Sequence, residues 1–232
     1  MQQISFCLTN WNRTNLLIKS FEQIINDDRI KEFVISDDHS NIGSYQELVD
    51  HFKFNPKVKF FRNDKQLGVY ENKFMSVSHA TSDWCIVADS DNVYGTDFID
   101  KIFALEPWDE YMSYQPSFLK PIFNYSRFSG LVLSRQNVSQ FIGKPMFDCL
   151  LNSMNFFVNR EQYLKTWMPK ENILGADSIY FNYLWFKSEK AMFVVPGLEY
   201  FHLVHDGSNY KAHEHASAPQ AKEIEKLLKR MS

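Results

Sequence analysis

Four short apolar runs alternate with segments of helical periodicity over the first 92 residues, and this alternation restricts the fold more than any other feature of the chain. Short apolar runs between polar residues predict strands, whereas apolar residues three and four apart predict amphipathic helices. The predicted strands are residues 4–9, 32–36, 58–61 and 84–88, and the predicted helices between them are residues 14–25, 44–54 and 70–80. This order is typical of βαβ units, so we expect an α/β fold with a parallel sheet.

Polar side chains follow each of these strands, in clusters at residues 10–13, 37–40, 62–64 and 89–92. Right-handed crossovers bring the loops after parallel strands to one edge of the sheet, and open α/β sheets bind ligands at that edge. The last cluster places two carboxylates, Asp89 and Asp91, directly after a strand. Taken alone, this Asp-x-Asp tripeptide favours a solvated acidic turn at a strand end, because the pattern arises by chance in many proteins of this size. The four clusters together predict a polar ligand site.

The alternation weakens after residue 92, and we expect one domain whose two halves share a sheet. The predicted elements are helices at 96–105, 160–167 and 176–186, a short helix at 135–143, a strand at 155–158, irregular structure with short strands at 106–130, a strand at 191–195 stopped by Pro196 and Gly197, and a terminal helix at 219–230. The apolar face of that last helix is expected to comprise Ile224, Leu227, Leu228 and Met231, at helical spacing.

Composition limits the class of protein. A chain of 232 residues with 44% hydrophobic content can bury one sizeable core. A net charge of −3 gives no overall basic character, so we expect no nucleic-acid partner. The sequence shows no signal peptide and no run near the roughly 18 apolar residues of a transmembrane helix. The three widely spaced cysteines suit a reducing compartment. We therefore expect a cytoplasmic protein, with peripheral attachment to a membrane left open.

Residues 4–92 resemble, motif by motif, the nucleotide-binding half of the inverting GT-A glycosyltransferases of family 2. The matching motifs are Leu8-Thr9-Asn10-Trp11-Asn12-Arg13, Asp37-Asp38-His39-Ser40, a loop from Asn63 to Gly68, and Asp89-Ser90-Asp91-Asn92. The resemblance implies the GT-A fold, a Rossmann-like, mixed but mostly parallel sheet flanked by helices. It also implies a nucleotide-sugar half at residues 1–95, an acceptor-binding and catalytic half at 96–216 within the same domain, and a C-terminal helix at 217–232.

The resemblance assigns roles in the donor half. Asp91 would ligate Mn²⁺ or Mg²⁺ with help from Asp89, because such a cation bridges carboxylates to phosphates and stabilises the departing diphosphate. Asp38 would hydrogen-bond the base. The other expected donor-binding residues are Thr9, Asn10, Asn12, Arg13, Asp37, Asn63, Gly68, Lys73 and Ser90. Lys73 replaces an Arg common in the family, and the alternative for it is a solvated helix residue. His39 replaces the family's Gly, which makes that turn bulkier.

The second half would supply the general base. Gly175-Ala176-Asp177-Ser178 resembles the segment that carries it in the family, with Ala176 where Glu is common. In a single inverting displacement, a carboxylate takes the proton of the attacking acceptor hydroxyl, and Asp177 is the predicted base. The alternative is that Asp177 only caps its helix, since Asp is favoured there.

Two further assignments concern the metal and the acceptor. His205-Asp206-Gly207-Ser208 resembles a late His-x-x-Ser segment that completes the metal shell in the family, so His205 is preferred over His202 as a further ligand. Residues 206–216 are expected to form a lid over the pyrophosphate. Within the aromatic stretch after residue 106, Trp108 and Tyr114 are the predicted acceptor-stacking residues, and the other rings are expected in the core.

The sequence thus predicts a metal-dependent, inverting glycosyltransferase that moves a sugar from a nucleotide-diphosphate sugar, with UDP favoured, to a saccharide or glycoconjugate acceptor in polysaccharide biosynthesis. One alternative is a non-catalytic nucleotide-sugar-binding member of the fold, which the intact Asp89, Asp91 and Asp177 disfavour. Another is a sugar-phosphate nucleotidyltransferase, which needs a glycine-rich loop after the first strand. Residues 10–13 contain no glycine, and this also disfavours dinucleotide-binding enzymes.

Overall fold

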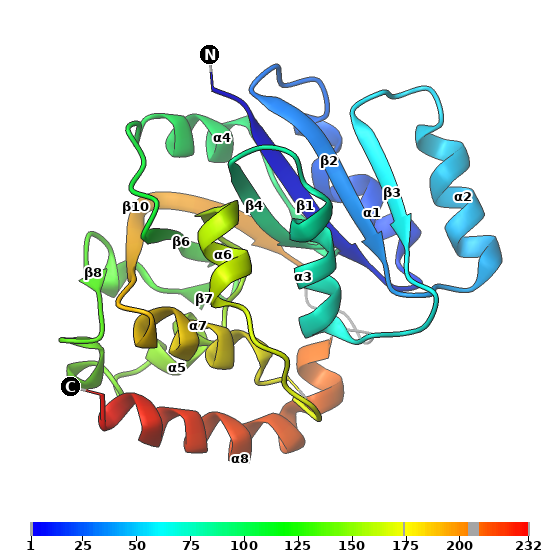
Figure 1. Cartoon of the computed structure of the whole chain (residues 1–232). Helices are drawn as coiled ribbons and strands as arrows, with labels where there is room; N and C mark the ends of the chain where they lie inside the picture. The colour runs from blue at the N-terminus through cyan, green and yellow to red at the C-terminus, as the bar shows by residue number, and fades with distance from the viewer. Residues whose placement is uncertain (1, 174, 204–208, 232) are drawn as a thin grey trace.

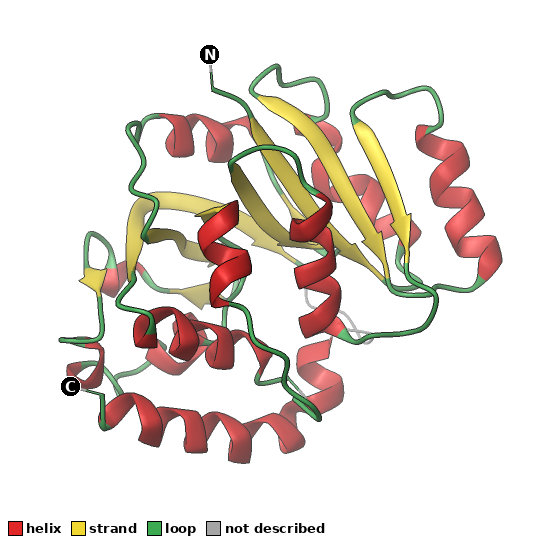
Figure 2. Cartoon of the chain, viewed as in Figure 1, coloured by secondary structure: helices red, strands yellow, loops and turns green. Residues whose placement is uncertain are grey.

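A computed structural model of the chain describes residues 2–173, 175–203 and 209–231, with side chains described up to residue 203 and again from residue 218. One mixed sheet runs through both halves in the order β3-β2-β1-β4-β9-β6-β10-β5, with β7 beside β6 and β8 beside β10 (Figure 2). The strands are β1 (Ile4–Asn10), β2 (Ile30–Asp37), β3 (Val58–Arg62), β4 (Trp84–Asp89), β5 (Asn92–Val93), β6 (Met112–Lys120), β7 (Phe123–Asn124), β8 (Val132–Leu133), β9 (Phe157–Asn159) and β10 (Ala191–His202). Strands β1 to β4 are parallel, and β9 joins them to the second half through antiparallel pairings with β4 and β6.

Helices cover both faces of this sheet (Figure 1). They are α1 (Thr14–Phe21), α2 (Ile42–Phe52), α3 (Val69–His79), α4 (Thr96–Phe103), α5 (Phe147–Leu151), α6 (Arg160–Thr166), α7 (Asp177–Lys187) and α8 (Asn209–Lys229). The α/β architecture and the strand–helix order of the first half are as predicted. No helix within the described ranges is long and apolar enough to cross a membrane.

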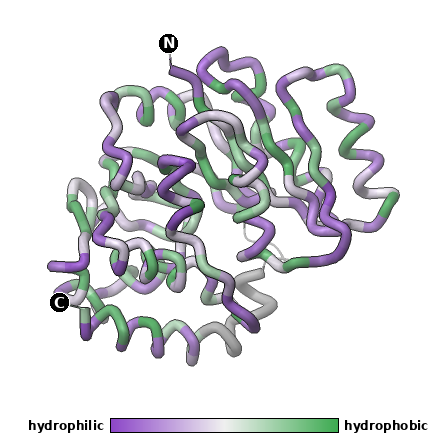
Figure 3. The backbone as a smooth tube through the Cα atoms, in the orientation of Figure 1, coloured by the Kyte–Doolittle hydropathy of each residue, from purple (hydrophilic) through white to green (hydrophobic). Residues whose placement is uncertain are grey.

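Two hydrophobic clusters follow from the alternation of side chains along the strands. Phe6 and Ile86 face the cluster that also buries Leu17 of α1 and Phe98 of α4, among other residues. Their neighbours face the opposite cluster, where Cys7 packs with residues from α3, α6 and α7, including Tyr70, Tyr163, Phe181 and Trp185. The inner strands β1 and β4 are buried on both faces and mainly apolar, whereas the ends of β2 and β3 and the loops after them are hydrophilic (Figure 3).

The structure corrects the prediction that Pro196 and Gly197 stop a strand. β10 continues to His202, and the two residues lie where its pairing with β6 shifts between Val195 and Glu199. Proline lacks an N–H and is tolerated at such a bulge, and Gly197 adopts φ +67° there. The same interruption accommodates Pro116, the register partner of Val195. The stretch expected to be irregular therefore contains the nine-residue strand β6.

Two helix predictions also change. The helix expected at 135–143 is only a 3₁₀ turn, Val138–Gln140. The terminal helix starts earlier than expected, with Pro219 inside it, and Leu227 of its expected apolar face is 40% exposed. The division of function at residue 95 stays a prediction.

Candidate active site

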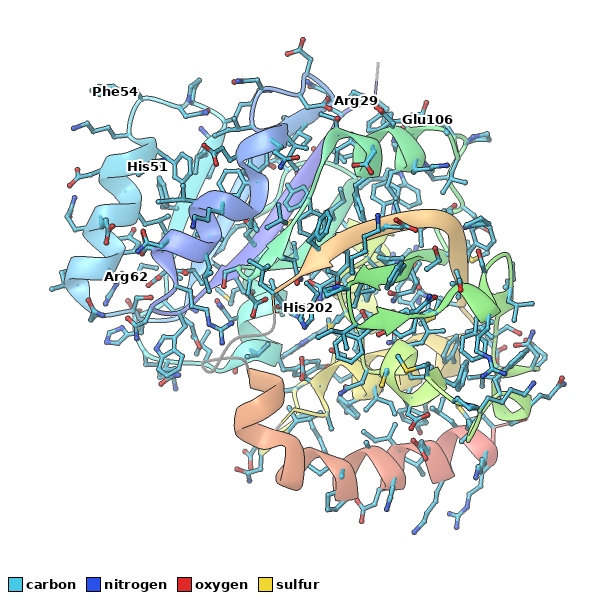
Figure 4. All side chains as sticks on the ribbon, turned by 180° about the vertical axis from the view of Figure 1, so that it is seen from behind. Arg29, His51, Phe54, Arg62, Glu106 and His202 are labelled. Carbon is cyan, nitrogen blue, oxygen red and sulfur yellow. The ribbon has the colours of Figure 1, made fainter. Side chains whose placement is uncertain are left out.

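A cavity of about 580 Å³ opens at the carboxyl ends of β1 and β4, where Thr9 and Asp89 are register partners. Small-molecule sites have volumes of about 300–1,000 Å³. The predicted donor-half residues that line it are Thr9, Asn10, Arg13, Asp38, Gly68, Lys73, Asp89, Ser90 and Asp91. The second half contributes Asp177 at the start of α7 and His202, labelled at the end of β10 in Figure 4. Both halves of the chain therefore contribute to one cavity.

Lys73 and Asp89 form an ion pair in the wall of this cavity. The Lys73 side chain comes from α3, is 3% exposed, and places Nζ 3.0 Å from Asp89 Oδ1. Burial by itself would lower the pKa of Lys73, but nearby carboxylates, Asp89 above all, outweigh it and raise the pKa. Burial likewise disfavours the ionised form of Asp89, but Lys73 and the Asn155 amide hold its pKa below the usual value. Lys73 is thus a fixed, buried cation, contrary to the alternative of a solvated helix residue.

Asp91 lies in the turn between β4 and β5 and is also paired with a cation. Its Oδ2 is 3.1 Å from Arg13 Nη1, and the residue is 5% exposed. The Asp91 carbonyl accepts a hydrogen bond from the Leu203 N–H, which ties this turn to the end of β10. His202 Nδ1 lies 2.7 Å from Asn92 Oδ1. Both predicted metal-binding carboxylates are therefore present at the cavity, each beside a positive charge.

The side chains fit only an open cation site. Within the described ranges, no three His, Cys, Asp or Glu residues are arranged to hold a metal ion. Mg²⁺ is commonly held by one or two carboxylates together with substrate phosphates, and Asp89 and Asp91 supply two such groups on the cavity wall. His202 is engaged with Asn92. His205, the preferred further ligand, and the first residues of the expected lid lie outside the described residues.

Asp38 organises the loop that follows β3. Its carboxylate accepts hydrogen bonds from the Leu67 N–H (2.7 Å) and the Gly68 N–H (2.9 Å), and from Asn63 Nδ2 at 3.2 Å. The neighbouring His39 adopts φ +59°, in the left-handed region where a glycine is less strained. The bulkier residue is accommodated because its Nδ1 lies 3.1 Å from the Asn63 carbonyl oxygen.

Three predicted donor-binding residues support the cavity without lining it. Asp37 is fully buried and accepts hydrogen bonds from Asn10 Nδ2 at 2.8 Å and Ser40 Oγ at 2.6 Å. The Asn12 side chain accepts from the Asn41 N–H. Asn63 donates to Asp38, as described above. These side chains hold the strand-end loops in place, and the surfaces that face the cavity belong to their neighbours.

Asp177 is a buried carboxylate, 6% exposed, in the first turn of α7. Burial raises its pKa above the ordinary value despite the lowering effect of Lys73. Ala176 occupies the N-cap position, so Asp177 makes no side-chain cap. The alternative in which this aspartate serves only as the cap is therefore not supported, and Asp177 lies in the cavity with an increased tendency to bind a proton.

Trp108 and Tyr114, the residues predicted to stack the acceptor, do not line this cavity. Both pack near Trp84, at the start of β4 and thus at the opposite end of that strand from Asp89, with ring centroids 5.3 Å and 6.3 Å from the Trp84 ring. Aromatic residues that do line the cavity are Phe123, Tyr125 and Tyr200. Phe123 and Tyr125 belong to the same aromatic stretch, and residue type alone does not separate a ring in the core from one in a cavity.

Sequence reasoning also missed two residues that line the cavity, Asn152 and Asn155. Both lie in the chain segment between α5 and β9. The available signal was topological. β9 runs antiparallel to β4, so the residue just before β9 lies at the edge where β4 ends. Without knowledge of that pairing, an isolated asparagine carries no information about its place.

Comparison with known proteins identifies the family. Residues 5–126 match the profile described as "Glycosyl transferase family 2". The chain belongs to glycosyl transferase family 2. A curated relative, "Abequosyltransferase RfbV" of Salmonella typhimurium, is 32% identical over 99 residues, which cover 40% of this chain and 29% of that protein.

Solved structures share the fold of this family 2 chain. S. aureus TarS 1–349 in complex with UDP-GlcNAc gives a TM-score of 0.73 at 13% identity, over 99% of this chain and 66% of TarS 1–349. TarS 1–349 in complex with UDP gives 0.66 at 13% identity, over 98% and 65%. The GT-A prediction is thereby confirmed. The chain spans less than two thirds of TarS 1–349, and its match covers under a third of RfbV.

Replacement of Lys73 by Met is expected to lower the free energy of unfolding by about 3 kcal/mol at neutral pH, because removing one partner of a buried pair leaves the other charge uncompensated. Lys73 holds the pKa of Asp89 low, so the pair contributes stability that is lost as the pH falls through the folded-state pKa. The difference from the parent protein should therefore shrink on acidification. Urea unfolding measures it, with the exposed Lys59→Met as control. Equal stability of the two variants at neutral pH would contradict the assignment.

Proposed function

We propose that this family 2 chain is an inverting, metal-dependent glycosyltransferase that moves a sugar from a nucleotide-diphosphate sugar to a saccharide or glycoconjugate. The observation that carries the proposal is one cavity lined by Asp89 at the end of β4, by Asp91 in the turn after it, and by the buried Asp177 at the start of α7. Inverting transfer needs both features, a charged site for the leaving diphosphate and a carboxylate for the acceptor proton. Residues 1–95 would form the donor half, and residues 96–216 the acceptor half.

The donor half would bind the nucleotide through residues already at the cavity. Asp38 would hydrogen-bond the base, and Thr9 and Asn10 would line the nucleoside site. Arg13 and Lys73 supply positive charge for the diphosphate. Mn²⁺ or Mg²⁺, held by Asp91 with help from Asp89, would offset the negative charge that develops on the leaving group. The TarS structures that share this fold contain UDP-GlcNAc or UDP, which supports a UDP-sugar as donor.

Asp177 would act as the general base. As the acceptor oxygen attacks the anomeric carbon, its proton moves to the Asp177 carboxylate, and the bond between that carbon and the diphosphate oxygen breaks on the opposite face. The configuration at the anomeric carbon is therefore inverted. The raised pKa of Asp177 supports this role, because a base with a pKa closer to the working pH accepts a proton more readily.

The acceptor would bind against the second-half wall of the cavity. The Phe123, Tyr125 and Tyr200 side chains line that wall, and aromatic rings provide apolar surface for packing against a sugar. The printed name of the RfbV relative, an abequosyltransferase, supports sugar transfer as the reaction class. We propose a role in polysaccharide biosynthesis on the same basis. The cytoplasmic location stays a prediction.

Thermal unfolding with a panel of nucleoside diphosphates tests the proposal. With MnCl₂ present, UDP at about 100 times its Kd adds roughly 2.7 kcal/mol of stability, which raises the Tm by about 5–10 °C for a chain of this size. The same concentrations of GDP, CDP, ADP and dTDP are the matched controls. A larger shift with another diphosphate would contradict the choice of uridine. No shift with any diphosphate would contradict nucleotide-sugar binding.

A further inference from the structure

The segment between α5 and β9 contacts both parts of the active site. It runs from Asn152 to Phe156 and contains Asn155, and both asparagines line the cavity. Asn155 binds Asp89 of the donor half, whereas Asn152 binds the backbone on either side of Asp177. Four residues of chain therefore connect the two carboxylates that the proposed reaction requires.

Asn155 uses both ends of its amide on Asp89. Its Oδ1 accepts a hydrogen bond from the Asp89 N–H at 2.8 Å, and its Nδ2 donates to Asp89 Oδ2 at 2.9 Å. A carboxylate only accepts hydrogen bonds and a backbone N–H only donates, so chemistry fixes the orientation of the amide. These two bonds fix the Asp89 carboxylate relative to its own backbone. Asn155 is 6% exposed, so water has little access to replace them.

Asn152 likewise uses both ends of its amide, here on the backbone at the start of α7. Its Nδ2 donates to the Gly175 carbonyl at 3.1 Å, and its Oδ1 accepts from the Ile179 N–H at 3.3 Å. These partners lie two residues before and two residues after Asp177. The Ile179 N–H is a donor that an N-cap side chain would ordinarily satisfy, and Ala176 at the N-cap has no group to do so. Asn152 therefore caps the helix from a different segment.

Helix α7 in turn donates hydrogen bonds to the segment that contains Asn152. Asn182 of α7 is fully buried, and its Nδ2 donates to the carbonyls of Leu151 at 2.7 Å and Ser153 at 3.2 Å. These carbonyls flank Asn152 in the chain. The segment and the start of α7 are thus joined in both directions, so a displacement of either one moves the other.

We propose that Asn155 and Asn152 are positioning residues that set the Asp89 carboxylate and the Asp177 carboxylate relative to one another across the cavity. The proposal rests on the proposed function, since it assigns Asp89 to the donor and Asp177 to the acceptor proton. Neither asparagine needs to touch the substrate. Catalysis is sensitive to such placement, because an error of about 1 Å in a reacting group costs roughly a hundredfold in rate.

The test compares three single alanine variants by UDP affinity with MnCl₂ and by turnover of a panel of UDP-sugars. Asn155→Ala is expected to weaken UDP binding about tenfold, and Asn152→Ala to lower kcat about tenfold or more while the UDP Kd stays within about twofold, because each change displaces a different carboxylate. Asn159→Ala is the matched control. Asn159 caps α6 by accepting from the Gln162 N–H, the equivalent third position of that helix, and does not line the cavity.

The control separates positioning from stability. Asn152→Ala and Asn159→Ala each remove one cap, so both should lower the Tm, but only the first should change kcat. If Asn152→Ala does not fold, Asn152→Asp keeps the acceptor for Ile179 and loses the donor to Gly175, and it too should lose turnover. The proposal is overturned if the cavity variants change Kd and kcat no more than Asn159→Ala, or if each changes both constants equally. A parent protein that neither binds UDP with MnCl₂ nor turns over any UDP-sugar overturns the proposed transfer from a UDP-sugar, and the positioning role with it.

Discussion

Asp177→Asn is expected to lower the rate of sugar transfer by a factor of roughly 10²–10⁴, which is the usual contribution of a general base. The amide has nearly the shape of the carboxylate but does not take the acceptor proton. Donor binding should persist, because the described contacts of Asp89 and Asp91 do not involve Asp177. Steady-state kinetics and calorimetric titration with UDP measure the two effects separately.

The matched control is Asp97→Asn, which also changes an aspartate in the first turn of a helix, but on the exposed surface of α4. It should leave kcat unchanged. Transfer that survives Asp177→Asn at the parent rate would show that another group takes the proton.

The pH dependence of kcat for the parent protein should also indicate that Asp177 is the general base. Burial raises the pKa of Asp177, and a general base works only when ionised, so kcat should fall on acidification at a pH above the ordinary aspartate range. The raised pKa also means that the ionised carboxylate destabilises the fold above that pKa, and that this effect disappears as the pH falls below the unfolded-state pKa. Asp177→Asn should therefore raise the Tm at neutral pH and raise it less in acid.

The second large effect concerns Asp91. Asp91→Ala is expected to weaken UDP binding in the presence of Mn²⁺ by at least about 100-fold, since changes to groups that merely support metal ligands already cost 10–100-fold. Without Mn²⁺, the affinity should be unchanged or higher, because Arg13 no longer has the Asp91 carboxylate as a competing partner. Calorimetric titrations with and without MnCl₂ measure both values.

Asp100→Ala provides the control, because it also removes a carboxylate paired with an arginine, here Arg29 on the surface. It should not change UDP affinity in either condition. An Asp91→Ala protein whose UDP binding still responds fully to Mn²⁺ would exclude Asp91 as the ligand.

The first half of the chain could be predicted from sequence because the signals that specify it are local. The hydrophobic pattern indicates β1 to β4 in their order along the chain, parallel pairing brings their ends to one edge, and Asp89 lies at the end of its strand. Even so, Asp37 and Asp38 have different environments that their adjacent positions do not reveal. Asp37 is buried behind Ser40 and Asn10, whereas Asp38 lines the cavity.

The second half of the chain depends on long-range strand pairing, which local patterns do not show. Trp108 is of a residue type that can stack on a sugar, but its ring packs against Trp84 at the edge of the core. Pro196 reads as a strand end, and only the bulge opposite Pro116 allows β10 to continue to His202. Asn155 reaches Asp89 because β9 is antiparallel to β4. Each of these outcomes was decided by a strand neighbour distant in sequence.

A crystal structure of the protein with UDP and MnCl₂, with the metal located by its anomalous signal, tests the central claim most directly. The account predicts the nucleotide in the cavity at the ends of β1 and β4, with the base near Asp38. It predicts that Asp91 would hold the Mn²⁺ ion, whose positive charge would offset the negative charge of the bound diphosphate. A nucleotide bound outside this cavity, or a metal ion away from Asp91, would contradict the account.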